Sequence, residues 1–115
     1  MEVQKLPEEA IIKKHVKTFL DILVLSMLND EPMYGYKIMA GIHKEFGVLL
    51  SPGSLYPLLH MLEDKGLIES SSHKGKIVYQ ISSKGKQKFK NIFNAYSLAI
   101  QKMWNFVKSR GKVSS

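Results

Sequence analysis

The segment Ser51–Ile68, SPGSLYPLLHMLEDKGLI, most limits the folds open to this chain, because a marked helix start leads directly into a strand pattern. Ser51 is a favoured N-cap, and Pro52 suits the first helical position, where a missing N–H costs nothing. One arc of this helix carries the apolar residues expected in a core: Leu55, Leu58, Leu59 and Leu62. The opposite arc carries small, polar and aromatic residues: Gly53, Ser54, Tyr56, Pro57, His60 and Met61. This second face predicts that a partner docks on the helix, which we expect to end near Gly66.

Two further helices are predicted upstream of this segment. Apolar residues recur at spacings of three and four from Glu8 to Leu28, and again from about Met33 to Phe46. The turn-forming sequence NDEP separates the two patterns. In the second helix we place Tyr36 in the core, whereas Tyr34 and Lys37 lie near its start.

After Gly66 the helical spacing of apolar residues gives way to an alternation with a period of two. This period predicts strands over 67–71 and 76–81, joined by a polar tip at 72–75. Lys74 and Lys76 flank Gly75 at this tip. Two helices with a tight link, followed by a basic hairpin, predict a winged helix-turn-helix, a mainly α fold of the α+β type.

A long final helix is predicted from Ser82 or Ser83 to about Lys108. Its apolar seam alternates spacings of four and three, as in a coiled coil. With the neighbouring tryptophan, the seam predicts a homodimer interface: Phe89, Phe93, Tyr96, Ile100, Met103, Trp104 and Val107. The expected organisation is a winged-helix domain with its N-terminal helix over 1–82, a dimerisation helix over 83–110 and a flexible tail over 111–115.

The charge of the chain is strongly asymmetric. All 10 acidic residues lie at or before Glu69, so residues 1–69 have a net charge of −3, and residues 70–115 have a net charge of +10. Such polarity fits a polyanion that contacts one surface, although a solvated basic face is an equally open interpretation.

Composition excludes several other classes of protein. A chain of 115 residues without cysteine forms one domain with no disulfide and no thiolate metal site. We expect no membrane span, because the longest apolar run falls far short of roughly 20 residues, and we expect a cytoplasmic protein. The four histidines are scattered, and no nucleophile has a partner base, so no enzyme activity, metal or cofactor is expected.

Four stretches of the sequence resemble the PadR-like family of winged-helix transcriptional regulators, in its short subfamily. They are LDILVLSML, EPMYGYKI, SPGSLYPLLHMLEDKGLI and VYQISSKGKQKF, and together they cover about Leu20 to Lys108. The resemblance implies a homodimer that binds double-stranded operator DNA, usually as a repressor. In some relatives a small aromatic effector releases the DNA. Met61 stands where relatives often carry a basic residue, which removes a contact to phosphate or base.

The resemblance and the residue chemistry together nominate two sites. The DNA-binding candidates offer hydroxyl, ammonium, imidazole and close backbone contacts: Tyr34, Lys37, Ser51, Gly53, Ser54, Tyr56, His60, Met61, Lys74 and Lys76. The candidates for the wall of an effector site are Phe93, Tyr96, Ile100 and Trp104. Plain interface packing is the alternative for this second set.

Three functions stay open at this point. The leading one is a dimeric regulator on a pseudo-palindromic operator with half-sites about one helical turn apart. The second is a winged-helix module that binds a protein partner, with its basic surface incidental. The third is a cationic amphipathic N-terminal helix that binds membrane through Lys13, Lys14 and Lys17.

Overall fold

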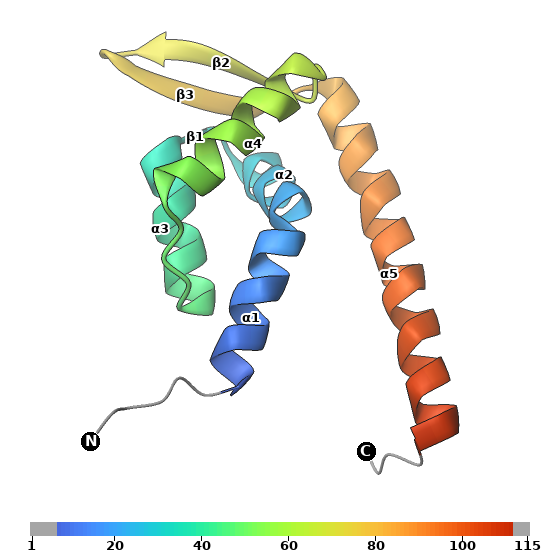
Figure 1. Cartoon of the computed structure of the whole chain (residues 1–115). Coiled ribbons are helices and arrows are strands. Elements are labelled where there is room, and N and C mark those ends of the chain that lie inside the picture. Colours follow the sequence, from blue (N-terminus) through green and yellow to red (C-terminus); the bar gives the residue numbers. More distant parts are fainter. Residues whose placement is uncertain (1–6, 112–115) are drawn as a thin grey trace, which may run out of the picture.

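The structure, a computed structural model, describes residues 7–111 (Figure 1). In chain order the elements are α1 (Pro7–Thr18), α2 (Leu20–Asp30), β1 (Met33–Tyr34), α3 (Gly35–Phe46), α4 (Pro52–Asp64), β2 (Ile68–His73), β3 (Lys76–Ile81) and α5 (Ser83–Gly111). Helices α1–α4 and the sheet form a head, and α5 leaves the head as a long arm (Figure 1). The predicted winged helix-turn-helix with a long C-terminal helix is confirmed.

The core of the head lies where α2, α3 and α4 meet the start of the hairpin. Its fully buried side chains include Leu25 and Val24 from α2, Ile38 from α3 and Ile68 from β2. The predicted core arc of α4 is confirmed, with Leu55, Leu59 and Leu62 buried and Leu58 half-buried against them. Burial of a leucine side chain stabilises a fold by roughly 1.5–3 kcal/mol, so this leucine arc fixes α4 in the head.

The predicted single helix over 8–28 is bent into two helices. Phe19 separates α1 from α2 with φ −101° and ψ 19°. Helical hydrogen bonds still cross the junction, because the Phe19 N–H donates to the His15 carbonyl at 2.8 Å. The Phe19 ring packs edge-on against Tyr96 of α5, with centroids 4.9 Å apart. No glycine or proline marks this junction, which coincides with the contact between Phe19 and α5.

A short strand replaces the predicted start of the second helix. Met33 pairs with Tyr79 and Tyr34 with Val78, so the sheet has the antiparallel order β1-β3-β2. Tyr34 therefore lies in a strand, and α3 begins at Gly35. Tyr36, which was placed in the core, is 56% exposed, so that prediction is wrong.

The hairpin turn is tighter than the predicted four-residue tip. His73 pairs with Lys76, which leaves only Lys74 and Gly75 in the turn. Both turn residues have left-handed backbones, with φ 51° and 78°. This is the two-residue geometry that matches the twist of paired strands.

The start of α5 is fixed to the head, as its predicted cap requires. The Ser82 hydroxyl accepts a hydrogen bond from the Gly85 N–H at 3.0 Å and donates one to the Gly66 carbonyl at 2.6 Å. The helix extends to Gly111, which was assigned to the flexible tail; residues 112–115 of that tail and residues 1–6 of the first predicted domain lie outside the described part.

Candidate nucleic-acid interface

The start of α4 is capped and exposed at the surface of the head. The Ser51 hydroxyl accepts a hydrogen bond from the Ser54 N–H at 3.2 Å, which confirms the predicted N-cap. A Cβ at Gly53 would come no closer than 3.8 Å to another residue, so the head's own packing does not require glycine there. The first turn of α4 thus offers hydroxyl groups and an open backbone to an anion.

Two tyrosines and a lysine form a second part of the candidate interface, beside the half of the hairpin nearer its tip. The rings of Tyr34 and Tyr36 stack with centroids 5.7 Å apart and planes 9° from parallel. The Lys76 Nζ lies 5.6 Å from the Tyr34 centroid and 5.4 Å from the Tyr36 centroid. We call Tyr34, Tyr36 and Lys76 the tyrosine–lysine cluster. Sequence reasoning missed Tyr36, because a helical pattern extended back to Met33 turns its side chain inward.

Tyr56 connects α4 to this cluster. Gly35 is buried between the two tyrosines, and a Cβ there would come within 2.5 Å of the Tyr56 hydroxyl. Tyr56 also lines a cleft of about 240 Å³ together with Tyr79 and the cluster. Burial raises the pKa of Tyr79, and the nearby Tyr56 and Glu63 act in the same direction. The half-buried Tyr56 therefore packs on the head as well as presenting one edge outward.

Lys37 already has an ionic partner inside the head. Its Nζ lies 2.7 Å from a carboxylate oxygen of Glu31, and this hydrogen bond is the main cause that raises the pKa of Lys37. Both side chains are about half exposed. A phosphate at Lys37 would have to compete with Glu31, so Lys37 is a weaker anion contact than its charge alone suggests.

The remaining DNA-binding candidates do not form one cluster. Lys74 is exposed at the hairpin tip, and His60 is exposed on α4. Met61 lies on the side of α4 that faces α5, where it lines a cavity of about 270 Å³ with Leu25 and Lys84. Met61 is thus separated from the cleft that holds the tyrosine–lysine cluster.

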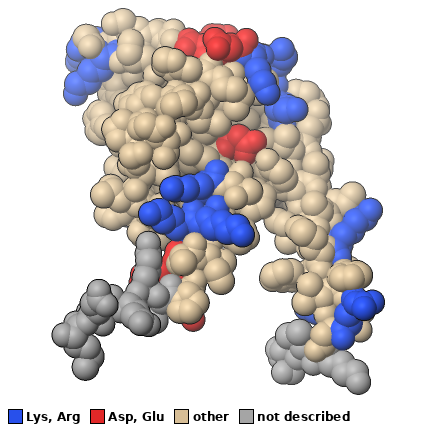
Figure 2. Space-filling model, viewed as in Figure 1, with Lys and Arg blue, Asp and Glu red and all other residues tan. Residues whose placement is uncertain are grey.

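Positive charge is distributed in groups over the face shown in Figure 2. Lys and Arg gather over the hairpin tip, over the junction of α4 and α5, over α1 and along α5. From Ser51 to Asp64, α4 and its cap contain no Lys or Arg. The helix that offers hydroxyl and apolar contacts therefore relies on neighbouring elements for cationic contacts.

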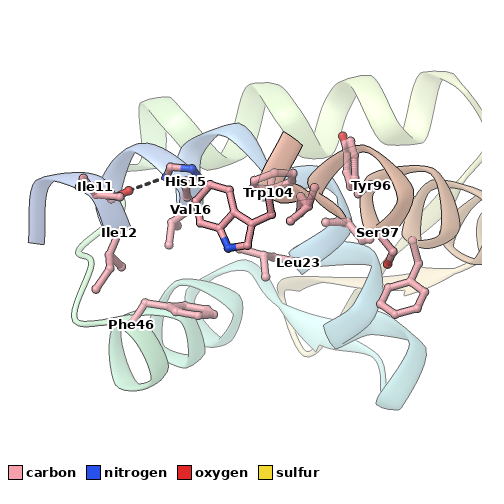
Figure 3. Close-up of a pocket in the computed structure, with 13 residues that line it drawn as sticks. Ile11, Ile12, His15, Val16, Leu23, Phe46, Tyr96, Ser97 and Trp104 are labelled. Carbon is pink, nitrogen blue, oxygen red and sulfur yellow. Dashed lines mark hydrogen bonds between the residues drawn. The ribbon is translucent and has the colours of Figure 1, made fainter. Parts of the chain in front are cut away.

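The four effector candidates line one apolar groove. Phe93, Tyr96, Ile100 and Trp104 of α5 form one wall of a cavity of about 570 Å³, and α1, α2 and Phe46 of α3 form the other (Figure 3). Sequence reasoning did not identify the opposite wall, because only the fold brings α1 across from α5. Trp104 is 62% exposed, so most of its surface has no partner within the chain.

Other seam residues differ in their surroundings. Phe89 is half-buried against the head, whereas Met103 is 56% and Val107 46% exposed. The Tyr96 hydroxyl donates to a carboxylate oxygen of Asp21 at 3.1 Å, and burial is the largest cause that raises the pKa of Tyr96. The seam therefore begins against the head and becomes unpartnered along the arm.

Within 7–111, no three of the histidine, aspartate and glutamate side chains are grouped to hold a metal ion. No helix in that range is long and apolar enough to cross a membrane.

Comparison with known proteins gives a consistent result. Residues 24–91 match the "Transcriptional regulator PadR-like family". A PadR family transcriptional regulator from Eggerthella lenta DSM 2243 has the same fold, with a TM-score of 0.76 at 22% identity over 88% of this chain and 92% of that chain. A PadR family transcription regulator from Clostridium difficile R20291 gives a TM-score of 0.67 at 27% identity over 77% of this chain and 98% of that chain.

A curated relative adds a sequence match of moderate length. Transcriptional activator GvpE from Haloferax mediterranei is 34% identical over 62 residues, which are 54% of this chain and 32% of that protein. The chain spans about a third or less of the length of the curated relatives that it matches.

Proposed function

Because the chain belongs to the PadR-like family of transcriptional regulators, we propose that it binds a pseudo-palindromic operator as a homodimer and represses the genes beside it. The family is one of regulators and not of enzymes, in agreement with the sequence. The observation that carries the proposal is the exposed surface formed by the capped start of α4 and the tyrosine–lysine cluster near the tip of the hairpin. Such a pairing suits a helix in the major groove with a hairpin on the backbone.

The dimer is supported by apolar surface on α5. Gly85 is the only described residue of α5 that is fully buried, whereas large side chains beyond it are exposed: Phe93, Leu98, Ile100, Met103, Trp104, Phe106 and Val107. Large exposed apolar side chains in such number mark an interaction site. A second copy of α5 offers a matching apolar seam, and a two-fold axis between the arms would set the spacing of two α4 helices.

Binding to a labelled duplex tests the DNA part of the proposal. The probes are the DNA upstream of the gene for this chain and an unrelated duplex of equal length, both at several salt concentrations. We expect preference for the upstream DNA and an affinity that falls steeply with salt. Absence of binding to either duplex at low salt would favour the alternative of a protein-interaction module.

Light scattering and a reporter gene test the remaining parts. The purified protein should have the mass of a dimer, and a monomer would contradict the role given to α5. Expression of the protein should lower the output of a reporter driven by the upstream DNA. An increase would show activation, the direction that the name of the Haloferax relative gives for that protein.

We further propose that the α1–α2–α5 groove accepts a small aromatic effector. Its lining is almost wholly apolar, and Trp104 is the single tryptophan of the chain. The naphthalene dye ANS should therefore quench Trp104 fluorescence and compete with DNA. Quenching that is absent, or unaffected by Ile12→Glu on the α1 wall of the groove, would assign these residues to interface packing alone.

A further inference from the structure

We propose that Tyr34 and Tyr36 are positioning residues that hold Lys76 in place for a DNA phosphate, an inference that rests on the proposed DNA binding. The Lys76 ammonium lies 5.6 Å from one ring centroid and 5.4 Å from the other. It therefore sits over both stacked rings and not over one ring alone. An ammonium at this distance is attracted by the negative face of each ring.

The ammonium keeps donors available for a phosphate. Among the described residues the one ion pair is Lys37 with Glu31, so no carboxylate neutralises Lys76. Lysine carries three N–H donors, and a ring face occupies only the side of the ammonium turned toward it. The rings thus limit where the ammonium goes without removing its charge or all of its donors.

The backbone brings the three side chains together from separate elements. Tyr34 pairs with Val78 across β1 and β3, and Lys76 lies two residues before Val78, on the same side of β3. The chain then enters α3 at Gly35, where a Cβ would require the end of the Tyr56 side chain to shift. Tyr36 follows on the first turn of α3 and completes the stack.

Packing of the head does not explain Tyr36. With 56% of its surface exposed, Tyr36 contributes little to the core, and the same first turn already places Ile38 inside. Its measurable contact is the stack that carries Lys76. A role toward Lys76 accounts for an aromatic residue on an outer surface.

Lys74 provides a matched control on the same hairpin. It is two residues away from Lys76, exposed at the turn, and no aromatic ring lies under its ammonium in the described residues. A free lysine loses rotamer freedom when it binds a phosphate, whereas Lys76 is already restricted by the rings. Loss of the ring platform should therefore weaken the contribution of Lys76 and leave that of Lys74 unchanged.

The test is a double-mutant cycle on binding to the upstream duplex. Tyr36→Leu should weaken binding about two- to five-fold per head, the equivalent of one exposed cation–π contact. Lys76→Ala should weaken binding and lower the salt slope by about one per head, because one phosphate contact is lost. In the Lys76→Ala background Tyr36→Leu should have little further effect, whereas in the Lys74→Ala background its full effect should persist.

Two further measurements separate the platform from other roles of Tyr36. Tyr36→Phe keeps the ring and should bind within about two-fold of the wild type. In protein without DNA, NMR should show the Lys76 ε-methylene protons shifted upfield by the rings, a shift that Tyr36→Phe keeps and Tyr36→Leu removes. Thermal melting of each variant checks that the exposed position tolerates the change.

Different outcomes would overturn the positioning role of the tyrosines and the proposed DNA binding. An equal effect of Tyr36→Leu with and without Lys76 would overturn the positioning role, and so would a Tyr36→Phe variant as weak as Tyr36→Leu. Unchanged affinity and salt slope in Lys76→Ala would overturn it while DNA binding stands. Failure of the wild type to bind either duplex would overturn the proposed function together with the inference.

Discussion

Gly85→Ala should destabilise the protein, against the usual preference of helices for alanine. Gly85 is buried near the start of α5, where a Cβ would overlap the backbone carbonyl oxygen of Leu67 and lie 2.7 Å from Cγ1 of Ile81. Because the Leu67 carbonyl is a backbone group, no rotamer change can move it away from the added Cβ. Relief therefore requires α5 to shift away from the link between α4 and β2.

The magnitude follows from three terms. Overpacking costs about 1–3 kcal/mol, and a rigid backbone partner places this site near the upper end. A shift of α5 also weakens the hydrogen bond from the Ser82 N–H to the Leu67 carbonyl, now 3.0 Å long, which contributes about 1 kcal/mol. The higher helix propensity of alanine offsets at most about 1 kcal/mol of this loss of stability. The expected loss of unfolding free energy is about 2–3 kcal/mol, or roughly 8–12 °C in Tm for a domain of this size.

Thermal unfolding at equal protomer concentration measures this loss. Gly53→Ala is the matched control, because Gly53 also lies near a helix start but has 3.8 Å of clearance. Its Tm should stay level or rise by a few degrees, since alanine is the better helix former by up to about 1 kcal/mol. A Gly85→Ala protein with a Tm equal to or above the wild type would refute the backbone contact as the reason for glycine.

Three other changes test separate parts of the structure. Met103→Glu places a charge in the exposed seam of α5 and should give a monomer by light scattering, whereas Asn105→Glu, off the seam, should stay dimeric; equal masses would refute the seam. Ser51→Ala removes the N-cap of α4 and should lower the free energy of unfolding, measured by denaturant titration, by about 1 kcal/mol. An unchanged free energy of unfolding would show that the cap does not stabilise the protein. Because the folded-state pKa of Tyr96 is raised, its contribution to stability is present below pH 10.0 and is lost as the pH rises above that value. Tyr96→Phe should therefore lose less stability than the wild type in denaturation above pH 10.0; equal losses would contradict this account.

Short-range sequence signals correctly predicted helix α4 and the hairpin. Ser51 and Pro52 mark the start of α4, and Gly66 marks its end, where the Leu67 N–H donates to the Leu62 carbonyl at 2.9 Å. The period-two residues of β3 predicted the hairpin. These features depend on residues close in sequence, so a single sequence contains them.

Features that depend on distant contacts were missed. The junction at Phe19 coincides with its contact with Tyr96, which is 77 positions away in the chain. Strand β1 is only two residues long and exists because β3 is beside it, so its own pattern resembles the start of a helix. The same error placed Tyr36 in the core and left it out of the candidate interface. The capped start of α4 was predictable, whereas the tyrosine–lysine cluster required the sheet.

The contact at Gly85 also determines how the two candidate sites relate. Leu67, against which Gly85 packs, directly follows the end of α4 and begins the hairpin, so the start of α5 is seated on the elements that form the proposed DNA face. From Phe93 onward the arm is held to the head chiefly by Tyr96, through its hydrogen bond to Asp21 and its contact with Phe19. An occupant of the groove meets α5 in this less restrained part. In the proposed dimer, a displacement of α5 in this part would change the separation of the two α4 helices more than the structure of either head, because the near end of α5 is seated on the head.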